Sequence, residues 1–263
     1  MVDPPEAMLF HRTPNPPLSE FVELLWLFEK PLPTHGRERV LPTGTIELVI
    51  NLNDRACGGF EAIVAGPHSR FFELDTRQPA SIVGVHFKPG GAFPFFTQPL
   101  DELHNIHVSL DALWRRRAAE IRELVMAAGG TQARLLMLEC ALTDLLPAAR
   151  RRHAAVTQAL AAFSQGARRI ADVVEESGLT SRRFIRLFKD EVGLTPKAFC
   201  RIRRFQSTLA ALHGRDDVDW ADTAVACGYY DQSHLIHDFQ DFAGLSPASY
   251  LSRRTEHMNH VPR

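Results

Sequence analysis

The chain has 263 residues, 45% of them hydrophobic, which is enough to bury one or two full cores. No stretch approaches the roughly 20 apolar residues of a membrane span, and the N-terminus lacks the layout of a secretory signal, so we expect a cytoplasmic protein. The formal net charge of −1 is unevenly distributed. Positions 1–150 hold 14 basic and 18 acidic residues, and positions 151–263 hold 16 basic and 13 acidic residues.

The N-terminal part is predicted to be β-rich. After a proline-rich start, residues 18–87 favour strands, and residues 40–52 alternate apolar and polar side chains. Three shorter apolar runs follow, separated by Gly, Pro and Asn. They cover residues 60–66, 70–74 and 80–87. Short strands at this spacing predict a small barrel or sandwich.

Helical spacing takes over after Gly90 and Gly91. Short turns are followed by predicted helices over residues 110–128 and 132–146, the second ended by Pro147. The second helix carries a stripe of leucines at intervals of three and four residues, which suits packing on the chain's own β region or a dimer seam. The stripe comprises Leu135, Leu138, Leu142 and Leu145. Residues 148–156 form the expected linker, and a helix over 156–163 opens the last region.

The last region repeats one helical unit. A segment starting at Ala171 matches one starting at Ala221 at an offset of 50, which becomes 51 after one inserted residue. The matched pairs are Ala171/Ala221, Asp172/Asp222, Gly178/Gly228, Phe184/Leu235, Phe188/Phe239, Gly193/Gly244, Pro196/Pro247 and Phe199/Tyr250. Each copy has the pattern of a helix-turn-helix, and two copies indicate a protein that reads two places on one regular polymer.

Local chemistry supports this layout in the first copy. Gly178 supplies the sharp turn, and Thr180 or Ser181 can cap the second helix. An inner apolar stripe then leaves a set of basic side chains facing outward. The stripe is Phe184, Leu187 and Phe188, and the outward set is Arg182, Arg183 and Arg186.

In the second copy Gly228 supplies the turn and Asp231 the cap. Leu235 and Phe239 form the inner face. The outward candidates are Gln232, Ser233, His234 and His237. The two histidines are expected to gain charge below about pH 6.5 and to tighten phosphate contacts.

Each copy closes with a helix stop and restart, G-L-T-P or G-L-S-P. The helix predicted from residue 196 to 212 joins the two copies and is about 25 Å long, at roughly 1.5 Å per residue. Successive major-groove faces of B-DNA lie about 34 Å apart. Both units can therefore bind one face of the duplex only if the DNA bends or the second unit binds less deeply.

Charge distinguishes the copies. Residues 168–204 hold 10 basic and 5 acidic residues, whereas residues 216–241 hold seven aspartates and no Lys or Arg. Because phosphate contacts need basic side chains, we expect the first copy to supply most of the electrostatic affinity for DNA.

The tandem repeat, the joining helix and both closures together resemble the C-terminal DNA-binding domain of the AraC/XylS transcription regulators, over residues 155–255. That resemblance implies that the second helix of each copy enters adjacent major grooves. The positions that match the family's reading face are Arg182, Ile185, Arg186, Gln232, Ser233, Ile236 and His237. Segments ERVLPTGTIELVINL, AGPHSR and GVHFKPGGAFPFF resemble an N-terminal domain of some members.

The resulting prediction is an α+β protein. Residues 1–110 form a β-rich, cupin-like barrel or sandwich with a regulatory role, residues 111–150 form a helical connector that allows dimerisation, and residues 151–263 bind DNA. The helix-turn-helix units are placed at about 168–191 and 218–243. The expected DNA contacts are Thr180, Ser181, Arg182, Arg183, Ile185, Arg186, Lys197, Arg201, Gln232, Ser233, His234, Ile236 and His237.

The predicted partner is double-stranded DNA, and the resemblance allows RNA polymerase, a small-molecule effector and a second copy of the chain as further partners. The main alternative is an enzyme or DNA-repair protein with a metal-based or thiol-based N-terminal site. Its candidate ligands would be His35, His68 and His86 with Glu47 or Glu61, but no H-x-H pair occurs. A third interpretation is an architectural DNA-binding protein without an effector.

The four cysteines, Cys57, Cys140, Cys200 and Cys227, form no C-x-x-C pair and are expected to be small buried hydrophobes. Cys57 has no neighbouring cysteine with which to share a metal. No P-loop, Rossmann or G-x-S-x-G pattern is present. We therefore expect no catalytic residue, no metal site and no cofactor.

Overall fold

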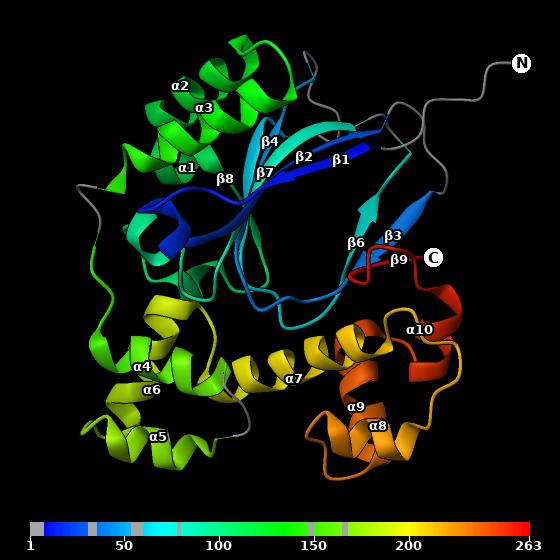
Figure 1. Cartoon of the computed structure of the whole chain (residues 1–263). Helices are drawn as coiled ribbons and strands as arrows, with labels where there is room; N and C mark the ends of the chain where they lie inside the picture. The colour runs from blue at the N-terminus through cyan, green and yellow to red at the C-terminus, as the bar shows by residue number, and fades with distance from the viewer. Residues whose placement is uncertain (1–7, 31–35, 54–59, 78–79, 147–149, 165–167) are drawn as a thin grey trace, which may run out of the picture.

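The computed structural model describes residues 8–30, 36–53, 60–77, 80–146, 150–164 and 168–263. The strands, including the one at His260–Pro262, and the helices within residues 8–143 form the upper body in Figure 1, here termed the N-terminal module. The helices within residues 154–253 form the lower body. The α+β class is confirmed, with a β-rich part followed by a helical part.

The larger sheet of the described residues has six antiparallel strands in the order β1-β2-β7-β4-β5-β8. Leu25 and Leu48 flank Val85 in the register, and all three are fully buried, so one sheet face forms a core. The strands are β1 (Met8–Arg12), β2 (Val22–Lys30), β4 (Glu47–Asn51), β5 (Ala62–Ala65), β7 (Ala80–Phe87) and β8 (His107–Ser109).

A smaller sheet pairs strands from the N-terminal and the C-terminal parts of the chain. Strand β3 (Arg37–Val40) pairs with β6 (Phe72–Asp75) on one side and with β9 (His260–Pro262) on the other. The C-terminal segment therefore belongs to the β structure, although the sequence assigned all of residues 151–263 to the DNA-binding part. Strands β1, β8 and β9 were not predicted, because three to five residues carry too little alternation to be recognised.

Helices α1 (Leu110–Trp114), α2 (Arg116–Ala127) and α3 (Thr131–Thr143) cover the larger sheet. The prediction of a single helix over residues 110–128 is wrong, because the helix breaks at Arg115, where φ is +51°. Trp114 is held in place by a 2.9 Å hydrogen bond from its Nε1 to the Phe95 carbonyl oxygen and by stacking on Phe96. The chain turns after this anchor so that α2 can pack on α3.

The leucine stripe of α3 packs within the chain. Leu135, Leu138 and Leu142 are fully buried in the same core as the larger sheet. The interpretation as packing on the chain's own β region is therefore confirmed for these residues. Helix α3 ends at Thr143, before the predicted residue 146, and Pro147 lies outside the described residues.

The lower body is helical and has a second core rich in phenylalanine. Its helices are α4 (Ala154–Ser164), α5 (Ile170–Glu176), α6 (Ser181–Val192), α7 (Pro196–Leu212), α8 (Trp220–Ala226), α9 (Gln232–Ala243) and α10 (Pro247–Arg253). Leu41, directly after β3, and Val261 of β9 are buried in this core, so the two bodies pack against each other. None of the helices in the described residues is long and apolar enough to cross a bilayer.

Candidate nucleic-acid interface

Helices α5 and α6 form the first helix-turn-helix unit, at one end of α7 (Figure 1). Gly178 makes the turn with φ +67°. Thr180, not Ser181, is the N-cap of α6, and its side chain accepts a hydrogen bond from the backbone N–H of Arg183. Gly193 ends the helix with φ +85°. The local signals in the sequence therefore act where they were expected.

Helix α6 buries one face and presents the other to solvent. Phe184 and Phe188 are fully buried, whereas Ile185 is 40% exposed. Arg182 and Arg183 are exposed in the first turn, and within the described part of the chain no ion pair engages either of them. Arg186 lies 3.9 Å from Asp190 and is 84% exposed, so its guanidinium is also available to a ligand.

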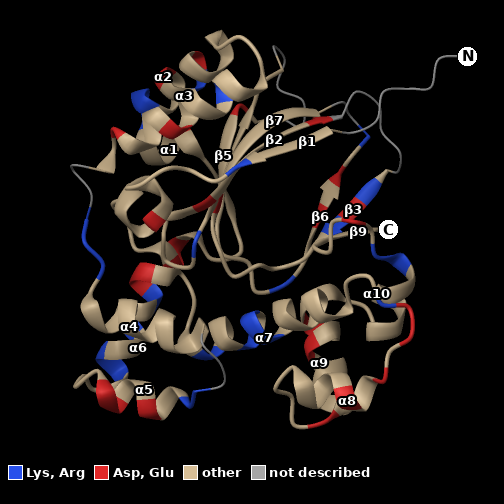
Figure 2. Ribbon diagram, viewed as in Figure 1, with Lys and Arg blue, Asp and Glu red and all other residues tan. Residues whose placement is uncertain are grey.

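Other basic residues of the first unit are already paired. Arg168 bonds Glu176, and Lys189 lies 2.9 Å from Asp101 of the N-terminal module. The freely exposed cations of this region are Arg169, Arg182, Arg183, Arg186 and Lys197. Figure 2 shows basic positions on α6 and along α7 and acidic positions on α8 and α9.

Helices α8 and α9 form the second unit, at the other end of α7. Asp231 caps α9 by accepting a 2.8 Å hydrogen bond from the His234 N–H, as the sequence predicted. Leu235 and Phe239 are fully buried. The outward side chains predicted for this unit, Gln232, Ser233 and His237, are exposed, and Ile236 is 37% exposed.

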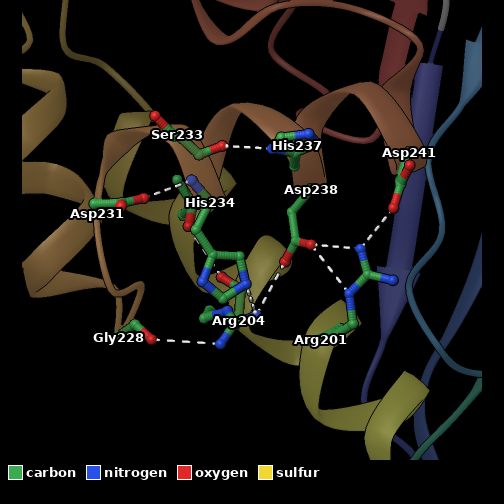
Figure 3. Close-up of polar contacts among 10 residues, drawn as sticks. Arg201, Arg204, Gly228, Asp231, Ser233, His234, His237, Asp238 and Asp241 are labelled. Carbon is green, nitrogen blue, oxygen red and sulfur yellow. Dashed lines mark hydrogen bonds and ion pairs between the residues drawn. The ribbon is translucent and has the colours of Figure 1, made fainter.

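A buried aspartate connects α9 to α7 (Figure 3). Asp238 is 1% exposed and accepts hydrogen bonds from Arg201 at 2.6 and 3.0 Å and from Arg204 at 3.2 Å. Arg201 also bonds Asp241 at 2.6 Å and lies over the Phe242 ring. Arg201, expected to contact DNA, is instead engaged within the protein, because two carboxylates on α9 satisfy its charge.

The structure also revises the expectation for His234. Its Nε2 lies 3.0 Å from Arg204 Nη2, and because a guanidinium only donates, the imidazole nitrogen is the acceptor of this hydrogen bond. The ring is half-buried and packs edge-on against Tyr229. His237 differs, since its Nδ1–H donates to the Ser233 carbonyl oxygen and the side chain is exposed.

Parts of the chain match two known domain families. Residues 173–253 match a helix-turn-helix domain family, and residues 11–109 match a domain of unknown function, DUF6597. The C-terminal part is an AraC-type helix-turn-helix domain. No curated protein sequence matches the chain.

Solved structures of ToxT from Vibrio cholerae are similar over most of the length. One is 10% identical with a TM-score of 0.43, covering 94% of this chain and 97% of that chain. ToxT bound to (E)-4-(8-methylnaphthalen-1-yl)but-3-enoic acid is 10% identical with a TM-score of 0.44, and the match covers 94% of this chain and 98% of that chain. Unsaturated fatty acid bound ToxT is 12% identical with a TM-score of 0.40, covering 94% of each chain.

The acidic composition of the second unit has structural causes, of which the sequence indicated only the Asp231 cap. Asp219 and Asp231 are the N-caps of α8 and α9. Asp238 and Asp241 bond Arg201, and Asp216 bonds Arg254 at 2.9 Å. Most of these carboxylates therefore stabilise the fold. Their negative charge is partly neutralised before DNA approaches.

Of the residues considered for a metal site, His86 and Glu47 come together, but His68 does not join them. His86 Nδ1 lies 2.8 Å from Glu47 Oε1 in the larger sheet, whereas the His68 ring packs against His107 and Phe72. No group of His, Cys, Asp and Glu in the described ranges has metal-binding geometry. His35 lies outside those ranges. His107 lies in strand β8.

The cysteines are not all buried as expected. Cys140 is exposed on the solvent side of α3, because the buried stripe occupies the opposite face, and Cys200 and Cys227 are half-buried. Burial raises the pKa of the Cys200 thiol to about 11, the opposite of what an activated thiolate needs. Cys57 lies outside the described residues.

Proposed function

We propose that this protein is a transcription regulator that binds specific DNA sequences through α6 and α9. The observation that carries the proposal is the orientation of these helices. Their C-terminal ends, at Gly193 and Gly244, pack against the N-terminal module, so their N-terminal turns point away from it. The N-terminal residues of a recognition helix are the ones that contact base edges in the major groove. DNA can approach these turns while the two bodies stay packed together.

The two helices offer different chemistry. Helix α6 presents Arg182 and Arg186, and arginine can bind guanine through two parallel hydrogen bonds. Helix α9 presents Gln232, whose amide can bind adenine in the same bidentate way, and it presents no cation of its own. We therefore assign the dominant, salt-dependent contact to the first unit and a weaker, base-reading contact to the second.

Helix α7 sets the distance between the two units. Its 17 residues correspond to about 25 Å, which is less than the roughly 34 Å between successive major-groove faces. The proposal therefore includes a bend in the bound DNA or a shallower contact by α9. A circular-permutation gel assay that showed no bend, together with full protection of both grooves, would contradict this part.

The N-terminal module is the regulatory part of the proposal. It contacts both reading units, through the Asp101–Lys189 ion pair at one end and through Arg39 at the other, where Nη1 donates to the Ala243 and Gly244 carbonyl oxygens. A small-molecule effector bound by this module would therefore act on both units. RNA polymerase is the partner through which such a regulator would change transcription.

Selection of bound sequences from a random DNA library, with the full chain and with and without a metabolite extract, tests the proposal. We expect enrichment of a bipartite motif, and loss of its better-defined half with Arg182→Ala. Arg215→Ala is the matched control, since Arg215 is exposed in the loop after α7. Enrichment of no motif, or an equal effect of both substitutions, would refute sequence-specific reading by α6.

A further inference from the structure

The glycines that close the two helix-turn-helix units both press against the N-terminal module. A Cβ on Gly193 would lie 2.5 Å from Pro67 Cγ and 3.0 Å from the Leu100 carbonyl oxygen. A Cβ on Gly244 would lie 2.5 Å from Phe71 Cε1. Since no side chain fits at these separations, each glycine permits a close approach in addition to its left-handed φ.

The turn glycines of the same units do not share this property. A Cβ on Gly178 would meet nothing within 4 Å, and one on Gly228 would have only Arg204 Cδ, at 3.9 Å. Their φ values of +67° and +81° are comparable with the +85° and +62° of the closure glycines. The close approach is therefore specific to the two closures, at equivalent positions of the repeat.

Both contacts come from one short connection. Pro67 and Phe71 belong to residues 66–71, which follow strand β5 and precede β6. Their Cα atoms are separated by four peptide units and hence by at most roughly 14 Å. One five-residue stretch thus touches the same structural point in both reading units.

Hydrogen bonds hold this connection to the N-terminal module. The backbone N–H of Asn105 donates to the Pro67 carbonyl oxygen at 3.3 Å, and the Asn105 side-chain oxygen accepts from the Ser69 N–H at 2.8 Å. The Gly66 N–H donates to the Ile106 carbonyl oxygen at 3.0 Å. The segment before β8 therefore braces the connection along most of its length.

Packing fixes the middle of the connection. The His68 side chain is buried, and its ring centroid lies 4.6 Å from that of Phe72 and 5.0 Å from that of His107. A Cβ on Gly66 would overlap the Leu103 carbonyl oxygen, so the start of the connection lies directly against the 3-10 turn η4 (Leu100–Leu103). The connection is a rigid part of the module.

Polar contacts secure both ends. At the first unit, Lys189 of α6 bonds Asp101 of η4 at 2.9 Å. At the second unit, the Arg39 guanidinium lies 4.6 Å from the centroid of the Phe71 ring and donates to the Gly244 carbonyl oxygen at 3.0 Å. Beside each end of the connection, a charged side chain thus forms a hydrogen bond between the N-terminal module and the reading unit.

We propose that residues 66–71 are a strut that positions α6 and α9 relative to each other. Helix α7 holds α9 at one end through Asp238 and packs against α6 at the other, and the connection adds a second link between the two units, which closes a triangle. The N-terminal module then fixes the half-site spacing that the protein accepts, and a movement of the strut changes that spacing. This inference rests on the proposed function, with Pro67 and Phe71 as positioning residues.

Glycine substitutions with matched backbone strain provide the variants. Gly193→Ala and Gly244→Ala add a Cβ where the strut presses. Gly178→Ala and Gly228→Ala add one at a similar φ with open space around it. Phe71→Ala removes the contact from the strut side and leaves both helix closures unchanged, so it decides the question even if a closure variant fails to fold.

The first readout is the distance between the units, without DNA. In the full chain with its native cysteines replaced, nitroxide labels at Glu175→Cys and Gln240→Cys report the separation of α5 and α9 by pulsed electron paramagnetic resonance. We expect a single narrow distribution in the parent and in the turn-glycine controls. With Phe71→Ala or Gly244→Ala it should become roughly twice as broad. Unchanged widths in Phe71→Ala would overturn the strut.

The second readout is DNA binding. Starting from the selected motif, the spacing between its halves is changed by one and two base pairs. The parent should lose about tenfold in affinity at a wrong spacing, and Phe71→Ala should lose only about threefold. An unchanged spacing preference in Phe71→Ala would overturn the strut. If the parent binds no DNA at all, the proposed function fails, and the distance measurement still decides the inference.

Discussion

Asp238→Ala should release helix α9 from α7. The carboxylate is 1% exposed and accepts three hydrogen bonds from two guanidinium groups, at 2.6, 3.0 and 3.2 Å. Removing one partner of a buried ion pair costs about 3 to 5 kcal/mol. Arg201 and Arg204 are 34% and 24% exposed, so water can solvate them once the carboxylate is gone. We therefore expect a loss of about 2 to 3 kcal/mol.

Hydrogen exchange of the α9 backbone amides, followed by mass spectrometry, measures this loss locally. The opening free energy should fall by the amount above, which makes exchange roughly 30 to 150 times faster. Asp241→Ala is the control, because Asp241 bonds the same Arg201 but is 58% exposed, and it should cost at most about 1 kcal/mol. Equal effects of the two substitutions, or unchanged protection in Asp238→Ala, would show that Asp238 does not hold α9 to α7.

Three further outcomes are expected. Arg182→Ala should cost about 1 to 3 kcal/mol of binding free energy at the preferred site and relax the base preference, whereas Lys197→Ala should weaken binding to all sequences alike. Competition binding against random DNA separates the two effects. Equal effects of the two substitutions would contradict the assignment. Burial, with His107 nearby, lowers the pKa of His68 from 6.5 to about 4, so the unfolded chain takes up the proton first as the pH falls. The free energy of unfolding of the parent should therefore fall by roughly 3 kcal/mol more than that of His68→Phe between about pH 6.5 and 4. Urea unfolding measures it at each pH, and an equal fall in the two proteins would refute this. His237→Ala should weaken binding to the preferred site, because the exposed His237 side chain belongs to the reading face of α9; unchanged affinity would remove His237 from the DNA contacts.

The helix-turn-helix units were predictable because their signals are local. Caps such as Thr180 and Asp231 and closures such as Gly193 depend on residues within one turn of the helix, so sequence spacing alone specifies them. The outward position of Arg182 follows from the same periodicity. These features need no knowledge of distant parts of the chain.

Features that depend on distant residues were missed. Arg201 reads as a phosphate contact on an exposed helix face, but its partner Asp238 is 37 positions away and comes near only when α9 packs on α7. Strand β9 is too short to be recognised before it pairs with β3. The break at Arg115 depends on how Trp114 is anchored to Phe95. In each case tertiary contacts override an otherwise sound local expectation.

Hydroxyl-radical footprinting of the full chain on its selected DNA site shows whether α6 and α9 read one DNA site together. We expect two protected segments on one face of the duplex, about one helical turn or 10 base pairs apart. Protection should be stronger over the half contacted by α6 and should be lost there in Arg182→Ala. A single protected segment, or two segments on opposite faces of the duplex, would contradict the claim that α6 and α9 read one DNA site together.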